Sequence, residues 1–321
     1  MSEPTETPSK PPPAFARIAY LSGGVGGARL LDGLYRAVPA DTLSVIVNTG
    51  DDFKHWGLYV CPDVDTVLYT LSGLGDAKRG WGLRGDSFRT LGMVAYYGGE
   101  DWFQLGDQDL ATHLMRSRWL KDGLTLTEVT QRLAGALGVE CRVLPMSDFR
   151  VETMIETASD GTLSFQDWLV RRRGEPAVAR VRFQGQAAPS QAVLDALSSA
   201  ELIVIGPSNP YVSIDPILSL PSVREAMAGH RVIAVSPIVG GRAVKGPLTE
   251  MIPALAKRAP SAAAIAAHYG DLLSGMVVER GDEADLGHLP TLATATVMKS
   301  RRDRLRLARE LLSFAETVVP G

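Results

Sequence analysis

Four aspartates that lie within fifteen residues are the side chains of this chain best suited to chemistry: Asp51, Asp52, Asp63 and Asp65. The first two directly follow an apolar stretch, and one of the second two is expected at the start of a helix. Carboxylates that converge beside a phosphate site commonly hold Mg²⁺, which keeps several waters and is shared with substrate phosphates. The cluster therefore predicts a magnesium site. The simpler interpretation, a helix cap, is expected for one of the four.

A glycine-rich turn precedes this cluster. Residues 22–28 read Ser-Gly-Gly-Val-Gly-Gly-Ala, between an apolar run at 18–21 and an amphipathic stretch at 30–38. Unpaired amides at a helix start, together with the helix dipole, favour an anion. The turn lacks the Lys-Ser/Thr of a P-loop, and its spacing is not a clean G-x-G-x-x-G. It predicts a phosphate-bearing ligand, with a plain strand-to-helix turn as the alternative.

Three more apolar strands are expected to end in polar, glycine- or asparagine-marked turns. They are residues 43–47, 202–205 and 232–235. In an open parallel sheet, ligands bind beyond the carboxyl ends of the strands. These three turns and the glycine-rich turn are therefore expected to line one crevice.

The alternation of strands and helices along the chain predicts an α/β fold. We expect a Rossmann-like, three-layer αβα arrangement with a mostly parallel sheet and a small helical insertion domain. The predicted division is a disordered Pro-rich tail at 1–14, an α/β nucleotide-binding domain at 15–72 and 139–321, and the insertion at 73–138. Helices are expected at 109–121 and 125–137, and a hairpin with strands at 151–157 and 163–170.

Composition excludes several classes of protein. The 321 residues carry a net charge of −3, whereas non-specific nucleic-acid binding needs a basic face. The two cysteines make no disulfide framework, and a nucleophilic role is not expected for Cys61. No apolar run approaches the roughly 18 residues of a membrane span, and the N-terminus has no hydrophobic signal core. We expect a cytoplasmic enzyme with neither a nucleic-acid nor a membrane partner.

Aromatic and further acidic residues give weaker indications. Trp81 stands between two glycines beside basic residues and could stack on a planar ring. Trp102 and Phe103 are expected in the core. Asp107 is expected to contact a ligand, and Asp109 is open between a ligand contact and a helix cap.

Ten sequence blocks in order resemble the 2-phospho-L-lactate transferases of deazaflavin (coenzyme F-420) biosynthesis, the CofD/FbiA family. The resemblance runs from about residue 18 to the C-terminus. Its most specific blocks are SGGVGGARLLDGL (22–34), VNTGDD (47–52), CPDVDTVLYTL (61–71), RGWG (79–82), LGDQDLATHLMRS (105–117), IGPSNPYVSIDPILSLP (205–221) and SPIVGG (236–241).

The resemblance implies a Mg²⁺-dependent reaction. The donor is a guanosine diphosphate ester of a three-carbon acid, and the terminal ribityl hydroxyl of the deazaflavin precursor FO attacks its acid-side phosphorus. GMP leaves, and a phosphodiester joins the acid to the deazaflavin. Such displacement needs charge neutralisation and in-line alignment more than covalent catalysis. The resemblance also implies a homodimer.

The resemblance also assigns roles to residues of this chain. Asp51, Asp63 and Asp65 are expected to be catalytic. Asp51, Asp52 and Asp63 are expected to hold the metal, with Asp65 as the alternative to Asp63 and with Asp52 dispensable in the family. The sequence does not decide which acid orients or deprotonates the ribityl hydroxyl. The donor phosphates are expected to bind at Gly24, Val25, Gly26 and Gly27. The guanine-nucleotide end of the donor is expected at Ser208, Asn209 and Pro210. FO is expected to contact Asp65, Thr66, Trp81 and Asp107. Lys245 is open between a phosphate contact and a loop lysine.

Two other functions fit parts of the pattern. A NAD-dependent Rossmann oxidoreductase would use the acids at 51 and 52 for the ribose, but the clustered carboxylates and the lack of a hydride-transfer site count against it. A nucleotide-sugar-sensing regulator on a related fold would keep the glycine turn and bind without turnover. It would need neither Trp81 nor the full aspartate cluster.

Overall fold

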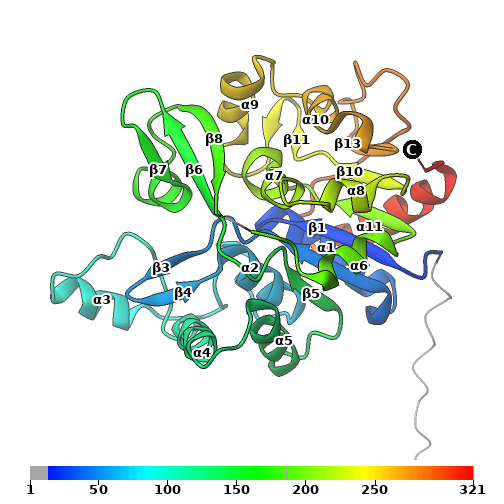
Figure 1. The fold of residues 1–321 in the computed structure, drawn as a ribbon. Helices are drawn as coiled ribbons and strands as arrows, with labels where there is room; N and C mark the ends of the chain where they lie inside the picture. Colours follow the sequence, from blue (N-terminus) through cyan, green and yellow to red (C-terminus); the bar gives the residue numbers. More distant parts are fainter. Residues whose placement is uncertain (1–13, 186, 321) are drawn as a thin grey trace, which may run out of the picture.

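A seven-stranded sheet forms the centre of the molecule (Figure 1). The structure, a computed structural model, describes residues 14–185 and 187–320, so the predicted disordered tail lies almost entirely outside the described residues. All neighbouring strands of the sheet run parallel, in the spatial order β14-β13-β10-β9-β1-β2-β5. The strands are β1 (Ile18–Ser22), β2 (Leu43–Val47), β5 (Arg142–Pro145), β9 (Leu202–Ile205), β10 (Val232–Val235), β13 (Gly275–Glu279) and β14 (Thr291–Thr294).

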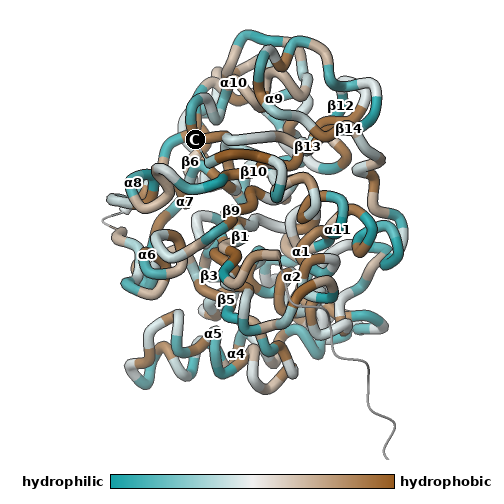
Figure 2. Tube along the Cα trace, turned by 90° about the vertical axis from the view of Figure 1, so that its right-hand side faces the viewer, coloured by the Kyte–Doolittle hydropathy of each residue, from teal (hydrophilic) through white to brown (hydrophobic). Residues whose placement is uncertain are grey.

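Alternate residues of each strand enter two different hydrophobic cores. In β1, Ile18 and Tyr20 belong to one core, whereas Ala19 and Leu21 belong to the other. This is why the strands read as continuous apolar runs, as is usual for a sheet covered on both faces. In Figure 2 the central strands form a hydrophobic band between more polar helices.

Helices cover both faces of the sheet. One core includes residues of α1 (Val25–Ala37), α2 (Pro62–Leu71), α5 (Leu126–Ala136) and α11 (Arg301–Thr317). The other includes residues of α6 (Gln191–Ser198), α7 (Asp215–Leu218), α8 (Val223–Met227), α9 (Leu248–Ala256) and α10 (Ala262–Tyr269). The Rossmann-like three-layer prediction is confirmed.

The strand order contains one topological switch point. From β1 the chain moves outward to β2 and β5, and then returns to the other side of β1 to add β9, β10, β13 and β14. The connections that follow β1 and β9 therefore leave the sheet toward opposite faces, which opens a crevice between them. The glycine-rich turn and residues 206–210 stand at this crevice.

Smaller elements surround the carboxyl edge of the sheet. They are an antiparallel hairpin of β3 (Phe53–His55) and β4 (Leu58–Val60), helices α3 (Arg89–Tyr96) and α4 (Asp109–Lys121), and a sheet of β7 (Thr162–Ser164), β6 (Glu152–Thr157) and β8 (Val178–Gln184). The shortest are β11 (Ile238–Val239), β12 (Arg242–Ala243), the 3-10 turns Ala40–Thr42 and Gly270–Leu272, and the π-helical turns Asp167–Arg171 and Pro210–Ile214.

The expected helices at 109–121 and 125–137 appear as α4 and α5, and the predicted capping box of α5 is formed by Thr125 and Glu128. The strand expected at 163–170 is wrong beyond Ser164. Phe165 and Trp168, three residues apart, are both buried in the same core, and three-residue spacing belongs to a helical turn rather than a strand.

Three expectations stay predictions: the division into an α/β domain and an insertion, the homodimer, and the cytoplasmic location. Within the described ranges, no helix combines the length and apolar character that a membrane crossing requires.

Candidate functional site

Two cavities meet at the carboxyl edge of the sheet. The first, about 490 Å³, is lined by the glycine-rich turn and the loop after β9, and we call it the glycine-turn cavity. The second, about 370 Å³, is lined by α2 and by several aromatic rings, and we call it the aromatic cavity. Six residues line both cavities: Gly24, Val25, Asp51, Asp63, Phe165 and Leu169. The first four bring the glycine-rich turn and two acids to the junction at which groups bound in the two cavities would meet.

The glycine-rich turn permits two close approaches. A Cβ atom on Gly24 would lie 2.8 Å from Oδ1 of Asp63, and one on Gly26 would lie 2.3 Å from the carbonyl oxygen of Pro207. Helix α1 begins at Val25, and its N-cap, Gly24, makes no side-chain cap. Backbone amides at the helix start are thus left for an anion in the cavity. Gly27, expected to bind phosphate with the others, does not line the cavity.

Two of the four aspartates converge at the junction. Asn48 donates from Nδ2 to Oδ2 of Asp63 at 2.9 Å, while Oδ1 of Asp51 is buried without a hydrogen-bond partner among the described residues. Burial raises the pKa of Asp63 to about 6 and that of Asp51 well above its ordinary value, and the Asp63 charge raises the Asp51 pKa further. An orphan carboxylate oxygen beside a second buried carboxylate fits a hard cation such as Mg²⁺.

Of the other two aspartates, only Asp65 pairs with a buried arginine. Asp65 lines the aromatic cavity, but its Oδ2 accepts a hydrogen bond from Nη1 of Arg116 at 3.1 Å. Asp52 lines neither cavity. Burial raises its pKa, and the Cys61 thiol and the Arg116 guanidinium oppose the rise. No group of three or more metal-ligating acids, histidines or cysteines occurs in the part of the chain that the structure describes.

The helix-cap interpretation of these acids is wrong. Cys61 is the N-cap of α2 and makes no side-chain cap, so Asp63 and Asp65 lie within the first turn instead. Asp109 is likewise the first residue of α4, after the N-cap Gln108. A carboxylate in the first turn still interacts favourably with the positive end of the helix dipole.

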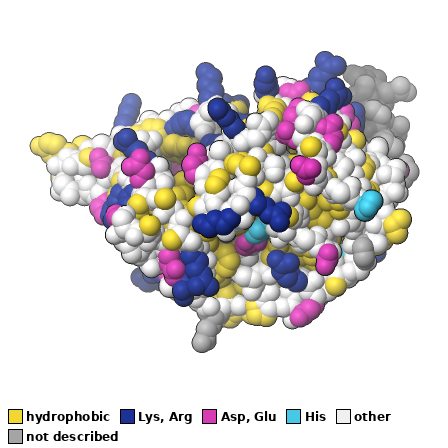
Figure 3. All heavy atoms as spheres, turned by 90° about the horizontal axis from the view of Figure 1, so that it is seen from above, with side chains coloured by type: hydrophobic (Ala, Val, Ile, Leu, Met, Phe, Trp, Pro, Cys, Tyr) yellow, Lys and Arg dark blue, Asp and Glu magenta, His cyan; other side chains and the backbone are white. Residues whose placement is uncertain are grey.

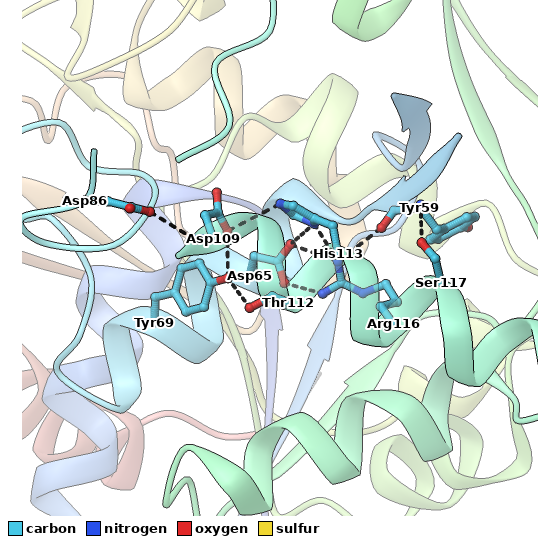
Figure 4. A network of polar contacts seen from close by, with 9 residues as sticks. All are labelled: Tyr59, Asp65, Tyr69, Asp86, Asp109, Thr112, His113, Arg116 and Ser117. Atoms are coloured by element: carbon cyan, nitrogen blue, oxygen red, sulfur yellow. Dashed lines mark hydrogen bonds and ion pairs between the residues drawn. The ribbon is translucent and has the colours of Figure 1, made fainter. Parts of the chain in front are cut away.

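Figure 4 shows how side chains of α4 join Asp65 and Asp109 in one network of polar contacts. Nδ1 of His113 lies 3.2 Å from Nη1 of Arg116, and Nε2 lies 3.3 Å from Oδ1 of Asp109. The Tyr69 hydroxyl donates to that same Asp109 oxygen at 2.7 Å. The network connects the buried ion pair to the wall of the aromatic cavity, which His113, Asp109 and Tyr69 also line.

Basic side chains line the glycine-turn cavity: Arg29, Lys78, Arg79 and Lys245. Lys245, left open by the sequence, reaches the cavity and donates from Nζ to the carbonyl oxygen of Arg79 at 3.1 Å. On the face seen in Figure 3, lysines and arginines lie near the centre and along the upper edge, with hydrophobic and acidic side chains among them. The four basic side chains of the glycine-turn cavity suit an anionic ligand although the chain as a whole is acidic.

The loop after β9 supplies the other wall of this cavity. Ser208 and Asn209 line it, whereas Pro210 does not. The Ser208 hydroxyl accepts a hydrogen bond from the amide of Gly23 at 3.1 Å, which joins the two sides of the switch-point crevice.

The aromatic cavity contains three of the four residues expected to contact FO: Asp65, Thr66 and Trp81. Asp107 is not among its lining. Its carboxylate accepts from the Ser87 hydroxyl at 2.6 Å and from the amide of Thr90 at 2.9 Å, which stabilises the start of α3 and holds the pKa of Asp107 low.

Sequence reasoning missed two aromatic residues of this wall. Trp102 and Phe103, expected in the core, are only partly buried and line the aromatic cavity. They lie between α3 and α4, outside any helix. The core position was expected because aromatic residues at helical spacing are usually buried, and that reason does not apply to a loop. Cys61 is fully buried with a pKa raised by burial, which agrees with the expectation that it is no nucleophile.

Known proteins match this chain over most of its length. The family model described as 2-phospho-L-lactate transferase CofD matches residues 18–308. A 2-phospho-L-lactate transferase of Methanosarcina mazei is 44% identical over 84% of this chain and 88% of its own. A phosphoenolpyruvate transferase of Streptomyces griseus is 41% identical over 94% of this chain and 99% of its own.

A solved structure of a Bacillus halodurans protein is similar in fold, with a TM-score of 0.62 at 18% identity over 92% of this chain and 99% of that one. The family match and the identities to the two transferases go further than the fold. This chain belongs to the 2-phospho-L-lactate transferase (CofD) family and is a transferase.

Proposed function

We propose that this transferase moves a phospho-acid from a guanosine diphosphate ester to the ribityl hydroxyl of FO and releases GMP, a step of coenzyme F-420 biosynthesis. The observation that carries the proposal is the junction of two unlike cavities at Gly24, Val25, Asp51 and Asp63. A reaction between two bound substrates needs such a meeting point, because proximity and alignment supply much of its acceleration.

The donor occupies the glycine-turn cavity. Its phosphates accept hydrogen bonds from the first amides of α1 and are neutralised by the basic side chains of the same cavity, including Lys245. Ser208 and Asn209 line the far wall, which faces the guanosine end of the donor.

The acceptor occupies the aromatic cavity. A planar deazaflavin ring suits a pocket bounded by Trp81, Trp102 and Phe103. Its ribityl chain then extends toward the junction, and Asp65, in the wall of the aromatic cavity, is the carboxylate that orients the terminal hydroxyl. The Arg116 partner fixes the position of that carboxylate.

Asp51 and Asp63 are the residues that would hold Mg²⁺. They converge at the junction, are buried, and leave one carboxylate oxygen without a partner among the described residues. The ion would neutralise charge on the diphosphate. Two protein carboxylates completed by phosphate oxygens and water are a usual magnesium environment. Asp52, which lines neither cavity, is left out of this set.

The experiment is incubation of the purified protein with FO, Mg²⁺ and, in turn, the guanosine diphosphate esters of lactate, enolpyruvate and glycerate. Chromatography with mass detection follows the deazaflavin. A product with the mass of FO plus one phospho-acid, together with GMP, supports the proposal and identifies the acid. Tight guanine-nucleotide binding without product from any donor would favour the nucleotide-sensing regulator instead.

A further inference from the structure

A third cavity, of about 290 Å³, lies between α1, α2 and the start of α11. Five basic side chains line it, and we call it the arginine cavity: Arg29, Arg84, Lys299, Arg301 and Arg304. The one acid in its lining, Asp76, already accepts a hydrogen bond from Nε of Arg79 at 2.9 Å. No role in the reaction described so far uses this concentration of positive charge.

Much of that charge has no counter-ion within the described residues. Arg304 pairs with Asp32 through Nη1 at 3.0 Å, yet its Nε is buried without a hydrogen-bond partner. Arg29 makes one long hydrogen bond, 3.4 Å, from Nη2 to the carbonyl oxygen of Ala77. Burial lowers the pKa of Arg29, and the charge of Arg304 lowers it further, so the two guanidinium groups repel one another. An anion between them would offset both the burial of the unpartnered Arg304 Nε and the repulsion between the two guanidinium groups.

The arginine cavity adjoins both reaction cavities. Val25 lines all three. Arg29, one turn further along α1, lines the glycine-turn cavity and the arginine cavity. Thr66 and Trp81 line the aromatic cavity and the arginine cavity. Three cavities therefore open around the start of α1.

The proposed reaction, on which this inference rests, likewise places three groups around the acid-side phosphorus: the ribityl hydroxyl, the leaving GMP and the retained acid. The ribityl oxygen forms a bond to the acid-side phosphorus and loses its proton, and the bond from that phosphorus to the oxygen of GMP breaks. The bond from the phosphorus to the acid persists. In an in-line displacement the incoming and leaving oxygens lie on opposite sides, so the retained acid must extend in a third direction.

We propose that the arginine cavity binds the carboxylate of the acid that the donor carries, between Arg29 and Arg304. Two guanidinium groups present paired donors to a carboxylate, which gives stronger and more directional hydrogen bonds than neutral groups. The cavity thereby selects donors whose acid carries a free carboxylate over donors of similar size in which that group is uncharged. The exposed Arg84 and Arg301 also line the arginine cavity and add electrostatic attraction for the carboxylate. Neither residue lines the glycine-turn cavity.

Donor binding without FO tests this inference, because no turnover occurs when the acceptor is left out. Calorimetry in Mg²⁺ compares the guanosine diphosphate ester of lactate with that of lactamide, which differs only in the carboxylate. We expect the lactate ester to bind the wild-type protein at least about tenfold more tightly. In Arg29→Gln that ratio falls close to one.

Two further variants separate the carboxylate from the phosphates. The double variant Arg84→Gln/Arg301→Gln changes only residues of the arginine cavity, and it should lower the ratio while affinity for GDP is kept. Arg302→Gln, the exposed neighbour of Arg301 that lines none of the three cavities, should keep the wild-type ratio.

Equal binding of the two esters by the wild-type protein, or an equal weakening of both in Arg29→Gln, overturns the inference while product formation with FO continues. Failure of the proposed function looks different: neither ester binds more tightly than GDP, and no donor yields product. In that case the carboxylate assignment falls together with the function.

Discussion

Arg116 donates from Nη1 to Oδ2 of Asp65 at 3.1 Å, and this ion pair joins α4 to α2. Both side chains are buried, and the carboxylate of Asp52 is influenced by the same guanidinium. One buried cation thus pairs with Asp65 and also opposes the rise in the pKa of a second buried acid, Asp52. The arrangement fixes Asp65 in place, and it makes this corner of the site dependent on a single arginine.

Replacement of Arg116 by methionine should destabilise the protein by about 3–5 kcal/mol, because it leaves the buried Asp65 carboxylate without its arginine partner. Urea unfolding measures the loss. The matched control is Arg118→Met on the same helix, where the arginine is exposed and paired with Asp122, and the expected change there is below about 1 kcal/mol. Equal stability of the two variants would contradict the interpretation of Asp65 and Arg116 as a buried pair.

Neighbouring aspartates should differ in their importance to the reaction. Asp51→Asn removes a carboxylate at the junction, so we expect kcat to fall about a hundredfold or more and the dependence on Mg²⁺ to weaken. Asp52→Asn removes an equally buried carboxylate that lines neither cavity, and magnesium dependence should be retained. Transfer rates measured across a magnesium titration compare them. A loss of magnesium response in Asp52→Asn alone would reverse the assignment.

The sign of the Asp63 effect on stability follows from its pKa. Folding raises that pKa to about 6 from an ordinary value of 3.8, so the folded protein holds a proton that the unfolded chain releases. In metal-free protein, this group stabilises the folded state below about pH 4, and that contribution is lost as the pH rises through 6. The buried Asp51, whose pKa is also raised, acts in the same direction.

Asp63→Asn should therefore be more stable than the wild-type protein at pH 7.5 in EDTA, and the difference should shrink as the pH falls through 6. Thermal unfolding at a series of pH values measures it, and Mg²⁺ should stabilise the wild-type protein but not the variant. The exposed Asp41→Asn serves as the control and should show no such trend. A wild-type protein that is the more stable of the two at pH 7.5 without metal would refute the prediction.

The fold could be predicted from the sequence because its signals are local. Continuous apolar runs such as residues 202–205 and 232–235 indicated buried parallel strands, and the spacing of Thr125 and Glu128 indicated a cap. The strand expected at 163–170 failed since a short apolar segment does not distinguish strand from helical turn. There, burial of Phe165 and Trp168 in one core decided the conformation.

The site was predictable in its members but not in their grouping. Four aspartates close together in sequence suggested one cluster, yet β2, the loop after it and α2 bring Asp51 and Asp63 to the junction and leave Asp52 outside both cavities. Arg116 is 51 residues from Asp65, and no local pattern announces their pairing. The arginine cavity likewise combines side chains from α1 and α11, which only the packed structure brings together.

The switch-point crevice supplies the last prediction. A Cβ atom at position 26 would come within 2.3 Å of the carbonyl oxygen of Pro207, a backbone atom, so Gly26→Ala must push the loop after β9 away from the start of α1. Overpacking of this kind costs about 1–3 kcal/mol and should weaken GDP binding, because the same movement widens the glycine-turn cavity.

The matched control is Gly135→Ala in α5, where an added Cβ meets nothing within 4 Å. Alanine favours a helix over glycine by up to about 1 kcal/mol, so this variant should unfold at the same or a higher temperature with unchanged GDP affinity. Thermal unfolding and calorimetry on both variants provide the comparison. If Gly26→Ala binds GDP as Gly135→Ala does, the crevice between Gly26 and Pro207 is not where the donor is held, and the glycine-turn cavity loses its assignment as the donor site.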